Sequence, residues 1–141
     1  MHQFRIIRFN FEDKETAEMA FSVRRKVFVE EQQVDPGLEY EHEEEATHYL
    51  VLVSEIPVAT ARWRKTDEGI KLERFATLKE YRNKGIGSKL LQRMLEDVIP
   101  LQLKIYLNSQ LPAIRFYERH GLKKVGEKFY EADMEHFKMV Y

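Results

Sequence analysis

The chain carries two kinds of hydrophobic pattern, one before residue 78 and one after it. Short runs rich in β-branched and aromatic residues predict strands at residues 4–9, 48–53, 58–64 and 70–78. The connectors SEIP and TDEG suit tight turns, so the last three runs predict an antiparallel meander. Before the meander, apolar residues at helical spacing predict a helix over residues 13–32, with Asp13 placed to cap it.

After residue 78 the apolar residues recur with a helical period. A single apolar face predicts a helix that ends before Pro100, and its members are Ile86, Leu90, Leu91, Met94, Leu95 and Val98. A strand is predicted at residues 101–107. A helix follows at residues 112–121, with proline in its first turn and Gly121 just past its end. Residues 122–130 and 134–141 close the chain as two more strands.

The order of these elements indicates the fold class. Strand, helix and strand in succession predict that residues 70–78 and 101–107 lie parallel, because two parallel strands need a long crossover between them. Combined with the meander, this predicts an α+β fold with a mixed sheet. The length of 141 residues suits one domain, residues 1–141, whose core needs no metal or disulfide to hold it.

Composition narrows the class of protein. The chain has 23 basic and 24 acidic residues, so no overall field attracts nucleic acid. It has no cysteine, which excludes disulfides, thiolate zinc sites and a cysteine acyl-enzyme. The N-terminus shows no signal peptide, and no apolar run approaches the roughly 20 residues of a membrane span. We therefore expect a cytoplasmic protein with no membrane or nucleic-acid partner.

The stretch YRNKGIGSK, residues 81–89, introduces the second predicted helix without an acidic cap. The first N–H groups of a helix lack internal partners and carry partial positive charge, so they can bind phosphates. Gly85 and Gly87 remove the Cβ atoms that would block a close approach, while Arg82 and Lys84 add charge. The same pattern also occurs in turns that are merely tight. It is neither a P-loop nor a G-x-G-x-x-G fingerprint.

Two blocks resemble the GCN5-related N-acetyltransferase (GNAT) superfamily. The first matches its R/Q-x-x-G-x-G/A turn between a strand and a helix, here Arg82, Asn83, Lys84, Gly85, Ile86 and Gly87. The second matches its N-x-x-x-x-A-x-x-F-Y-x-x-x-G-F motif at Asn108, Ala113, Phe116, Tyr117 and Gly121. Leu122 stands where the motif has its last phenylalanine. The blocks span residues 72–126, and the order of the predicted elements agrees over nearly the whole chain.

The first half narrows the resemblance to one bacterial branch. The stretch VRRKVFVEEQ and the ending EADMEHFKMVY are similar to the ElaA- and YjcF-like proteins. The resemblance implies a mostly antiparallel sheet whose single parallel strand pair splays apart, flanked by helices. It also implies an N-acetyltransferase that uses acetyl-CoA and acetylates an amine of a small molecule or peptide. The acceptor is left open, and so is a homodimer, since many relatives dimerise.

The resemblance further implies where acetyl-CoA binds. The pantetheine arm would lie along the strand backbone, and the pyrophosphate would accept hydrogen bonds from the N–H groups of the turn. The strand residues are Phe75, Ala76 and Thr77, and the turn continues from Asn83 to Ser88. A β-bulge in residues 70–78 is the usual device for turning the backbone toward the donor. Because the chain lacks cysteine, direct attack in a ternary complex is expected, with the N–H of Phe75 facing the developing oxyanion.

Three residues are candidates for catalysis. By the superfamily pattern Tyr117 would protonate the leaving sulfur; the alternative is a half-buried aromatic on an amphipathic helix. Asn108 would orient the cofactor arm or Tyr117, or else cap the next helix. Strand alternation predicts that Glu73 shares a face with Phe75, so Glu73 could act as the base. Its alternative is a solvent-facing carboxylate paired with Arg64 or Lys71.

The acceptor side offers further candidates. Glu44 and His48 lie in or after the acidic loop and could serve as the base or contact the acceptor. Arg24 falls on the apolar face of its helix and therefore needs an acceptor for its charge. Glu31 or an acidic-loop carboxylate could provide it, or Arg24 could bind an anionic group of the substrate. The acidic run at residues 41–45 is expected to be solvated, and no metal site is predicted.

Other functions remain open from the sequence. A module that binds acyl-CoA without turnover would keep the same motifs. An acyl-homoserine lactone synthase-like enzyme is suggested by R-x-x-V-F, although the chain is short for that class. Nucleic-acid binding through the basic patch at residues 82–89 would require steeply salt-dependent affinity. The net charge of −1 argues against it.

Overall fold

One mixed β-sheet organises the computed structural model, which describes residues 4–32 and 42–141. Its strand order within the described residues is β1-β2-β3-β4-β5-β7-β6. The strands are β1 Phe4–Asn10, β2 Thr47–Val53, β3 Ile56–Thr66, β4 Gly69–Thr77, β5 Ile105–Gln110, β6 Lys123–Glu131 and β7 Met134–Val140. Neighbours pair antiparallel except β4 and β5, which are parallel. The predicted meander, mixed sheet and parallel pair are confirmed.

The strand predicted at residues 101–107 is wrong in its first part. Ile99–Leu101 forms a 3₁₀ turn that contains Pro100, and Gln102 then adopts a left-handed φ of 59°. Proline cannot donate to a ladder, and the left-handed residue reverses the chain after the helix. The strand consequently begins at Ile105.

Three α-helices flank the sheet in the described part of the chain: α1 Lys14–Arg24, α3 Ile86–Val98 and α4 Ile114–Glu118. Asp13 caps α1, because its Oδ1 accepts from the Thr16 N–H at 3.2 Å. The predicted helix over residues 13–32 continues past α1, but as the π-helical segment Arg25–Glu31 (η1). A 3₁₀ turn, Leu111–Ala113, precedes α4, so α4 itself is shorter than predicted.

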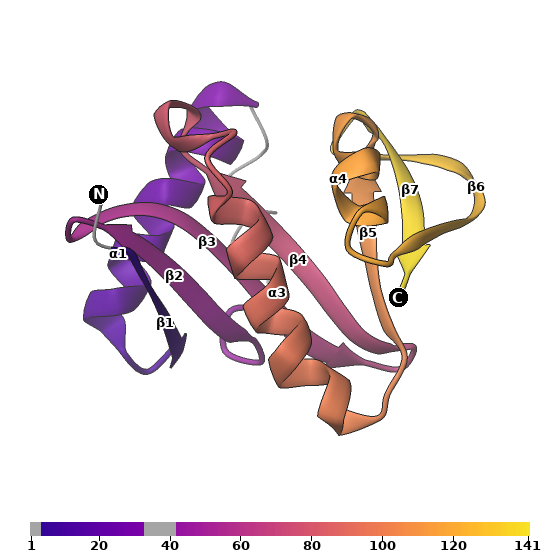
Figure 1. Ribbon diagram of the computed structural model, residues 1–141, viewed down its shortest axis with the longest axis horizontal. Coiled ribbons are helices and arrows are strands. Elements are labelled where there is room, and N and C mark those ends of the chain that lie inside the picture. The colour runs from indigo at the N-terminus through magenta and orange to yellow at the C-terminus, as the bar shows by residue number, and fades with distance from the viewer. Residues whose placement is uncertain (1–3, 33–41) are drawn as a thin grey trace.

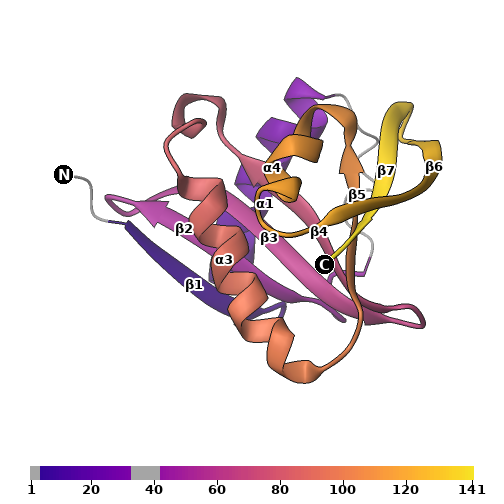
Figure 2. The ribbon, with the colours of Figure 1, turned by 45° about the vertical axis from the view of Figure 1, so that its right-hand side comes forward.

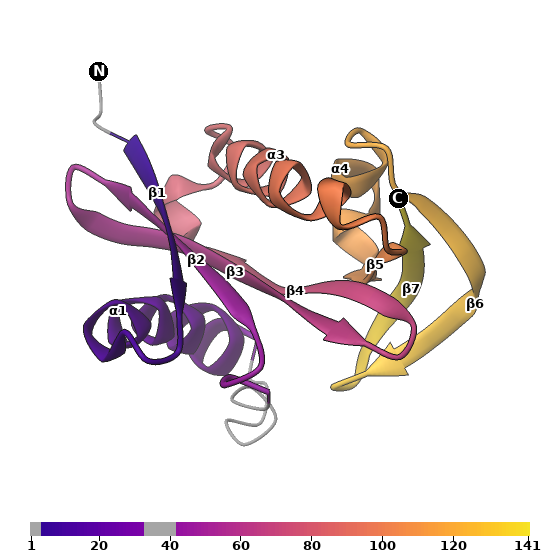
Figure 3. The same ribbon diagram turned by 90° about the horizontal axis from the view of Figure 1, so that it is seen from below.

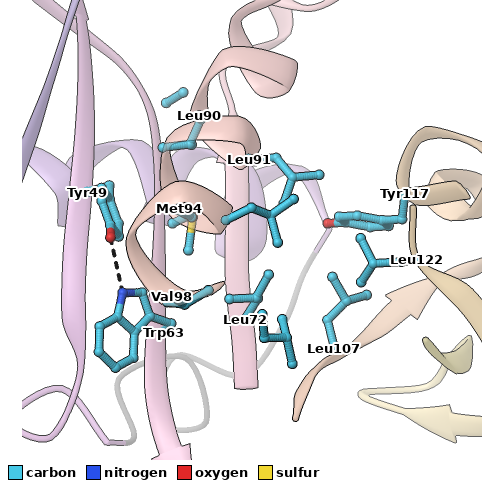
Figure 4. Packing of buried hydrophobic residues seen from close by; sticks show 14 of the residues in the cluster. Tyr49, Trp63, Leu72, Leu90, Leu91, Met94, Val98, Leu107, Tyr117 and Leu122 are labelled. Carbon is cyan, nitrogen blue, oxygen red and sulfur yellow. Dashed lines mark hydrogen bonds between the residues drawn. The ribbon is translucent and has the colours of Figure 1, made fainter. Parts of the chain in front are cut away.

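The helices cover opposite faces of the sheet. Figure 3 shows α1 against one face and α3 and α4 against the other. The apolar stripe of α3 packs on the second face, where Leu91 and Met94 are fully buried (Figure 4). In the same cluster Trp63 donates from Nε1 to the hydroxyl of Tyr49 at 3.1 Å, and that hydroxyl donates to Asp97 at 2.8 Å. Burial, followed by the bond to Asp97, raises the pKa of Tyr49 to about 12, so its proton stays in place.

The parallel pair separates along its length. The β4–β5 pairing runs from Ile70↔Ile105 to Leu72↔Leu107 and ends there. Beyond that point β5 leans away from β4 toward β7, which both Figure 1 and Figure 2 show. The sheet therefore opens between β4 and β5, on the side where α3 begins and α4 lies.

Candidate active site

A cavity of about 290 Å³ occupies the opening between β4 and β5. It is lined from both strands, from η1, from α4 and from the β6–β7 hairpin. Several residues predicted from the sequence lie on its wall: Glu73, Phe75, Asn108, Ala113 and Tyr117. The structure thus brings together side chains that are up to 44 positions apart in the sequence.

A β-bulge shapes one wall of this cavity. Arg62 pairs with Glu73 and Thr60 pairs with Ala76, so Arg74 and Phe75 together oppose a single residue of β3. Arg74 has a left-handed φ of 58°. The bulge that the family pattern led us to expect is therefore present.

The bulge overturns the prediction that Glu73 and Phe75 share a face. Phe75 packs against the core cluster on the α3–α4 face, edge-on to Tyr117 at 5.6 Å between ring centroids. Glu73 instead accepts from Arg62 on the α1 face. The extra residue shifts the alternation by one position, which is why a period of two gave the wrong face. Both residues nevertheless line the cavity, each from its own side.

Tyr117 lies on the α3–α4 side of the cavity. It is buried, and burial raises the pKa of its hydroxyl well above the ordinary value for tyrosine. In Figure 4 its ring extends from α4 with the oxygen pointing toward the side of the cluster where Leu91 and Leu72 lie. Phe116 contacts the Tyr117 ring edge-on at 5.1 Å. This arrangement keeps a protonated phenol at the cavity wall.

Asn108 presents an unpaired acceptor. Its Oδ1 is buried and has no hydrogen-bond partner among the residues that the structure describes. A buried oxygen without a donor is costly. Because Asn108 lines the cavity, an N–H of a bound molecule could satisfy it. An amide-bearing arm such as pantetheine fits this requirement.

The turn before α3 exposes backbone. Asn83 and Gly85 have left-handed φ values of 63° and 80°, and Gly85 is the N-cap of α3. Within residues 4–32 and 42–141, no side chain caps this helix. A Cβ built at Gly85 would meet no heavy atom within 4 Å, so the space in front of it is open. The amides at the start of α3 can therefore reach an anion.

Gly87 serves a different contact. A Cβ there would lie 3.5 Å from Cζ of Phe116, so α4 packs directly over this position. Ser88, one residue on, has its Oγ 3.0 Å from Nε2 of His120. The start of α3 and the end of α4 are thus joined beside the turn. Ile86, which lies between Gly85 and Gly87 in the sequence, is buried in the core.

The basic residues of the turn differ in their surroundings. Arg82 makes a two-point ion pair with Glu31 at 2.7 and 2.8 Å, and its Nε donates to the Thr77 carbonyl at 2.9 Å. The hydrogen bonds from Arg82 lower the pKa of Glu31, and those to Glu31 raise the pKa of Arg82. Lys84 instead lines a hollow of about 320 Å³ beside the turn, together with Lys89. Arg82 therefore fixes the turn to η1, while the two lysines border open space.

Glu73 lies among basic groups. Its Oε2 accepts from Arg62 Nε at 2.7 Å and from Arg64 Nε at 3.1 Å, and Lys71 lies 3.5 Å away. Burial raises the pKa of Glu73, but the charges of these three residues outweigh it and bring the pKa to about 2. The predicted partners Arg64 and Lys71 are both present, but the carboxylate is 7% exposed rather than solvent-facing.

A buried charge network continues from Glu73 toward α1. Arg62 is also paired with Glu43, and Glu43 accepts from Arg24 Nη1 at 3.1 Å. Arg24 is 1% exposed and pairs with this acidic-loop carboxylate, which is one of the three options left open by the sequence. The sequence alone did not single out Glu43 or Arg62. The register of the β3–β4 hairpin places Arg62 opposite Glu73 and could have indicated that pair.

The structure does not bring the remaining acceptor candidates to the cavity wall. Nε2 of His48 lies 3.0 Å from the Glu43 carbonyl, and its ring stacks on Phe9. Burial lowers the pKa of His48. Glu44 is exposed and lines a separate hollow next to Phe21. Ala76 is buried against η1 and the end of α1, so only its backbone is placed along the strand.

Two further properties of the described residues bear on the chemistry. No cluster of three His, Asp or Glu side chains in the described ranges is arranged to hold a metal ion. None of the helices in those ranges has the length and apolar character needed to cross a bilayer. The site that remains is the cavity between β4 and β5, with the turn before α3 at its edge.

Comparison with known proteins agrees with this geometry. A family model described as an acetyltransferase (GNAT) domain matches residues 12–141. The uncharacterized N-acetyltransferase YjcF of Bacillus subtilis (strain 168) is 35% identical over 131 residues, which cover 91% of this chain and 94% of YjcF. Escherichia coli ElaA has the same fold, with a TM-score of 0.87 at 22% identity over 96% of this chain and 98% of ElaA. An acyl-CoA N-acyltransferase from Pseudomonas aeruginosa gives 0.85 at 21% identity over 98% and 99% of the two chains.

Proposed function

The chain belongs to the GNAT acetyltransferase family, and from that premise we propose that it acetylates an amine of a small molecule or peptide with acetyl-CoA. The observation that supports the proposal best is the bulged, splayed opening between β4 and β5, where Phe75, Asn108 and Tyr117 line one cavity. We treat residues 1–141 as one acyltransferase domain.

The donor would enter from the α3–α4 face. Its diphosphate would be held by the amides at the start of α3, where Gly85 leaves open space, with Lys84 and Lys89 close by. The pantetheine arm would follow the backbone of Phe75 and Thr77, and Asn108 Oδ1 would accept one of its N–H groups. Arg82 would contribute by holding the turn in place through Glu31 rather than by contacting phosphate.

Two groups would act on the reacting thioester. The bulge takes the backbone around Arg74 and Phe75 out of the regular ladder, so the Phe75 N–H is the candidate donor to the oxyanion. Tyr117 would give its proton to the leaving sulfur, since burial keeps the phenol protonated at neutral pH. Attack of the amine nitrogen on the carbonyl carbon forms the C–N bond, and loss of the thiolate breaks the C–S bond.

Glu73 would bind the acceptor rather than take its proton. With a pKa of about 2 it accepts a proton poorly at neutral pH. Its negative charge, fixed at the cavity wall by Arg62, can instead hold the ammonium of an incoming acceptor or a water bound to it. The acceptor would then enter from the α1 face, opposite the donor.

The test is release of the CoA thiol from acetyl-CoA with a panel of amine acceptors. We expect turnover with at least one amine and a loss of about 100-fold or more in kcat for Tyr117→Phe, with CoA affinity retained. Tyr130→Phe is the control, because Tyr130 is 67% exposed on β6. CoA binding without release for every acceptor would instead support a binding module without turnover. Equal rates for Tyr117→Phe and wild type would remove Tyr117 from the mechanism.

A further inference from the structure

His136 lies at the cavity wall, on the face from which the acceptor would enter. It is 6% exposed on β7 and lines the cavity with Glu131. Its partner across the β5–β7 ladder is Gln110, so the two side chains share a face of the sheet. Gln110 exchanges hydrogen bonds with Gln32, next to η1, at 3.1 and 3.4 Å. The imidazole is therefore on the α1 side.

One hydrogen bond of His136 fixes its tautomer. Nδ1 lies 2.8 Å from the Met134 carbonyl oxygen. A carbonyl can only accept, so Nδ1 carries the proton and the neutral ring has its lone pair on Nε2. Phe129 stacks on the ring at 5.7 Å, which restricts its orientation. An acceptor nitrogen with a fixed direction is what a general base requires.

One carboxylate faces Nε2 of His136. Glu131 of the neighbouring strand β6 places its Oε2 3.7 Å from Nε2. The nearest cation on its own strand, Lys138, is paired with Glu68 at 2.7 Å. From β5 the ring meets the neutral Gln110, and across the cavity Lys71 and Arg74 lie beside Glu73.

The other residues predicted as the base are less suited to that role than His136. The basic neighbours of Glu73 keep it ionised and weakly basic, His48 is bonded to the Glu43 carbonyl, and Glu44 borders another hollow. On the basis of the proposed acetyl transfer, we infer that His136 is its general base, assisted by Glu131. The substrate class follows, because a base is needed for an alkylamine that arrives as an ammonium ion.

The proton balance is as follows. Nε2 of His136 takes one proton from the R–NH3⁺ acceptor, which leaves R–NH2 with a free lone pair. The amine attacks the carbonyl carbon, and the C–S bond then breaks. The nitrogen loses a second proton to water as the amide forms, and Tyr117 protonates the sulfur and is itself reprotonated by water. His136 returns its proton to solvent, so one proton is released in each turnover.

The experiment compares His136→Asn with wild type on two acceptors. Asparagine keeps a donor near the position of Nδ1 but has no basic nitrogen. For an alkylamine we expect kcat/KM to fall by about 100-fold or more near pH 7, and the deficit to shrink as pH approaches the range where the amine is neutral in solution. For an arylamine, which is neutral at pH 7, we expect a loss of less than about tenfold.

A control variant and a second test variant accompany His136→Asn. His42→Asn is the control, because His42 is exposed in the turn at residues 42–45 and asparagine tolerates its φ of 62°. Glu131→Gln is the second variant, should His136→Asn fold poorly, and should lower the alkylamine rate selectively. CoA affinity should stay within threefold in all three. No thiol release by wild type with any amine of the acceptor panel would overturn the proposed function and this inference together. Turnover by wild type with equal losses for the two acceptors, or none, would overturn the role of His136 alone.

Discussion

At the residue scale, left-handed backbone marks the two sides of the candidate active site. Arg74 in the bulge and Asn83 and Gly85 in the turn before α3 all have positive φ values, of 58°, 63° and 80°. Such conformations cost a side-chain-bearing residue about 1–2 kcal/mol, so they persist where the surrounding structure imposes them. At Gly85 the absent Cβ removes this cost and also leaves the amides of α3 accessible.

Gly85→Ala should separate these two effects when it is compared with Gly126→Ala. Gly126 has a similar φ of 73° and also has nothing within 4 Å of a built Cβ, but it lies in β6, away from the turn. We expect both substitutions to lower the free energy of unfolding by about 1–2 kcal/mol. Only Gly85→Ala should weaken CoA binding, by about tenfold or more, because its methyl group occupies the space for the phosphates. Urea unfolding and calorimetric titration with CoA measure the two quantities. Unchanged CoA affinity in Gly85→Ala would refute the assignment of this turn.

At the element scale, patterns of apolar residues predicted most strands and helices because each element buries one face. They did not predict the features that interrupt an element. The π-helical end of the first helix, the late start of β5 and the bulge in β4 all depend on backbone geometry that tertiary packing selects. Arg74 carries no turn-forming signal in its side chain, so the faces of Glu73 and Phe75 could not be assigned from alternation. The turn at Gly85 was predictable because glycine is itself the signal for a left-handed residue.

Deleting Arg74 tests what the bulge contributes. Without the extra residue, Phe75 would oppose β3 in a regular ladder and keep its face, so the fold should survive. The Phe75 N–H would then no longer be turned toward the reacting carbonyl, and we expect kcat to fall by about 10²–10³-fold. CoA affinity should change much less. Arg74→Gly keeps the extra residue and suits its φ of 58°, so it should retain activity to within about tenfold. If both variants lose activity equally, the side chain of Arg74, and not the bulge, is what matters.

At the scale of the whole molecule, a buried charge network links α1 to the strands that border the cavity. It connects Arg24 of α1, Glu43 of the turn at residues 42–45, Arg62 of β3 and Glu73 of β4. Removing one partner of such a pair leaves a buried charge without its counter-charge, which lowers the free energy of unfolding by about 3–5 kcal/mol. The network therefore couples the acceptor side of the cavity to the packing of α1 against the sheet.

This network predicts how stability depends on pH. Glu73 has a pKa of about 2 in the folded protein and 4.5 in its unperturbed state. A carboxylate with a lowered pKa stabilises the fold above the unfolded pKa, here by about 3 kcal/mol, and this stabilisation is lost as pH falls from about 4.5 toward 2. His48 acts at higher pH, because burial lowers its pKa from 6.5 and acidification then favours the unfolded state, which binds the proton more readily.

Urea unfolding of wild type and Glu73→Gln at pH 7, 5, 4 and 3 measures the difference in their free energies of unfolding. We expect the variant to be less stable at pH 7 and the gap to narrow below pH 4.5, whereas Glu55→Gln, which removes an exposed carboxylate paired with Arg5, should follow wild type. A constant gap from pH 7 to 3 would show that Glu73 does not stabilise the fold through its charge.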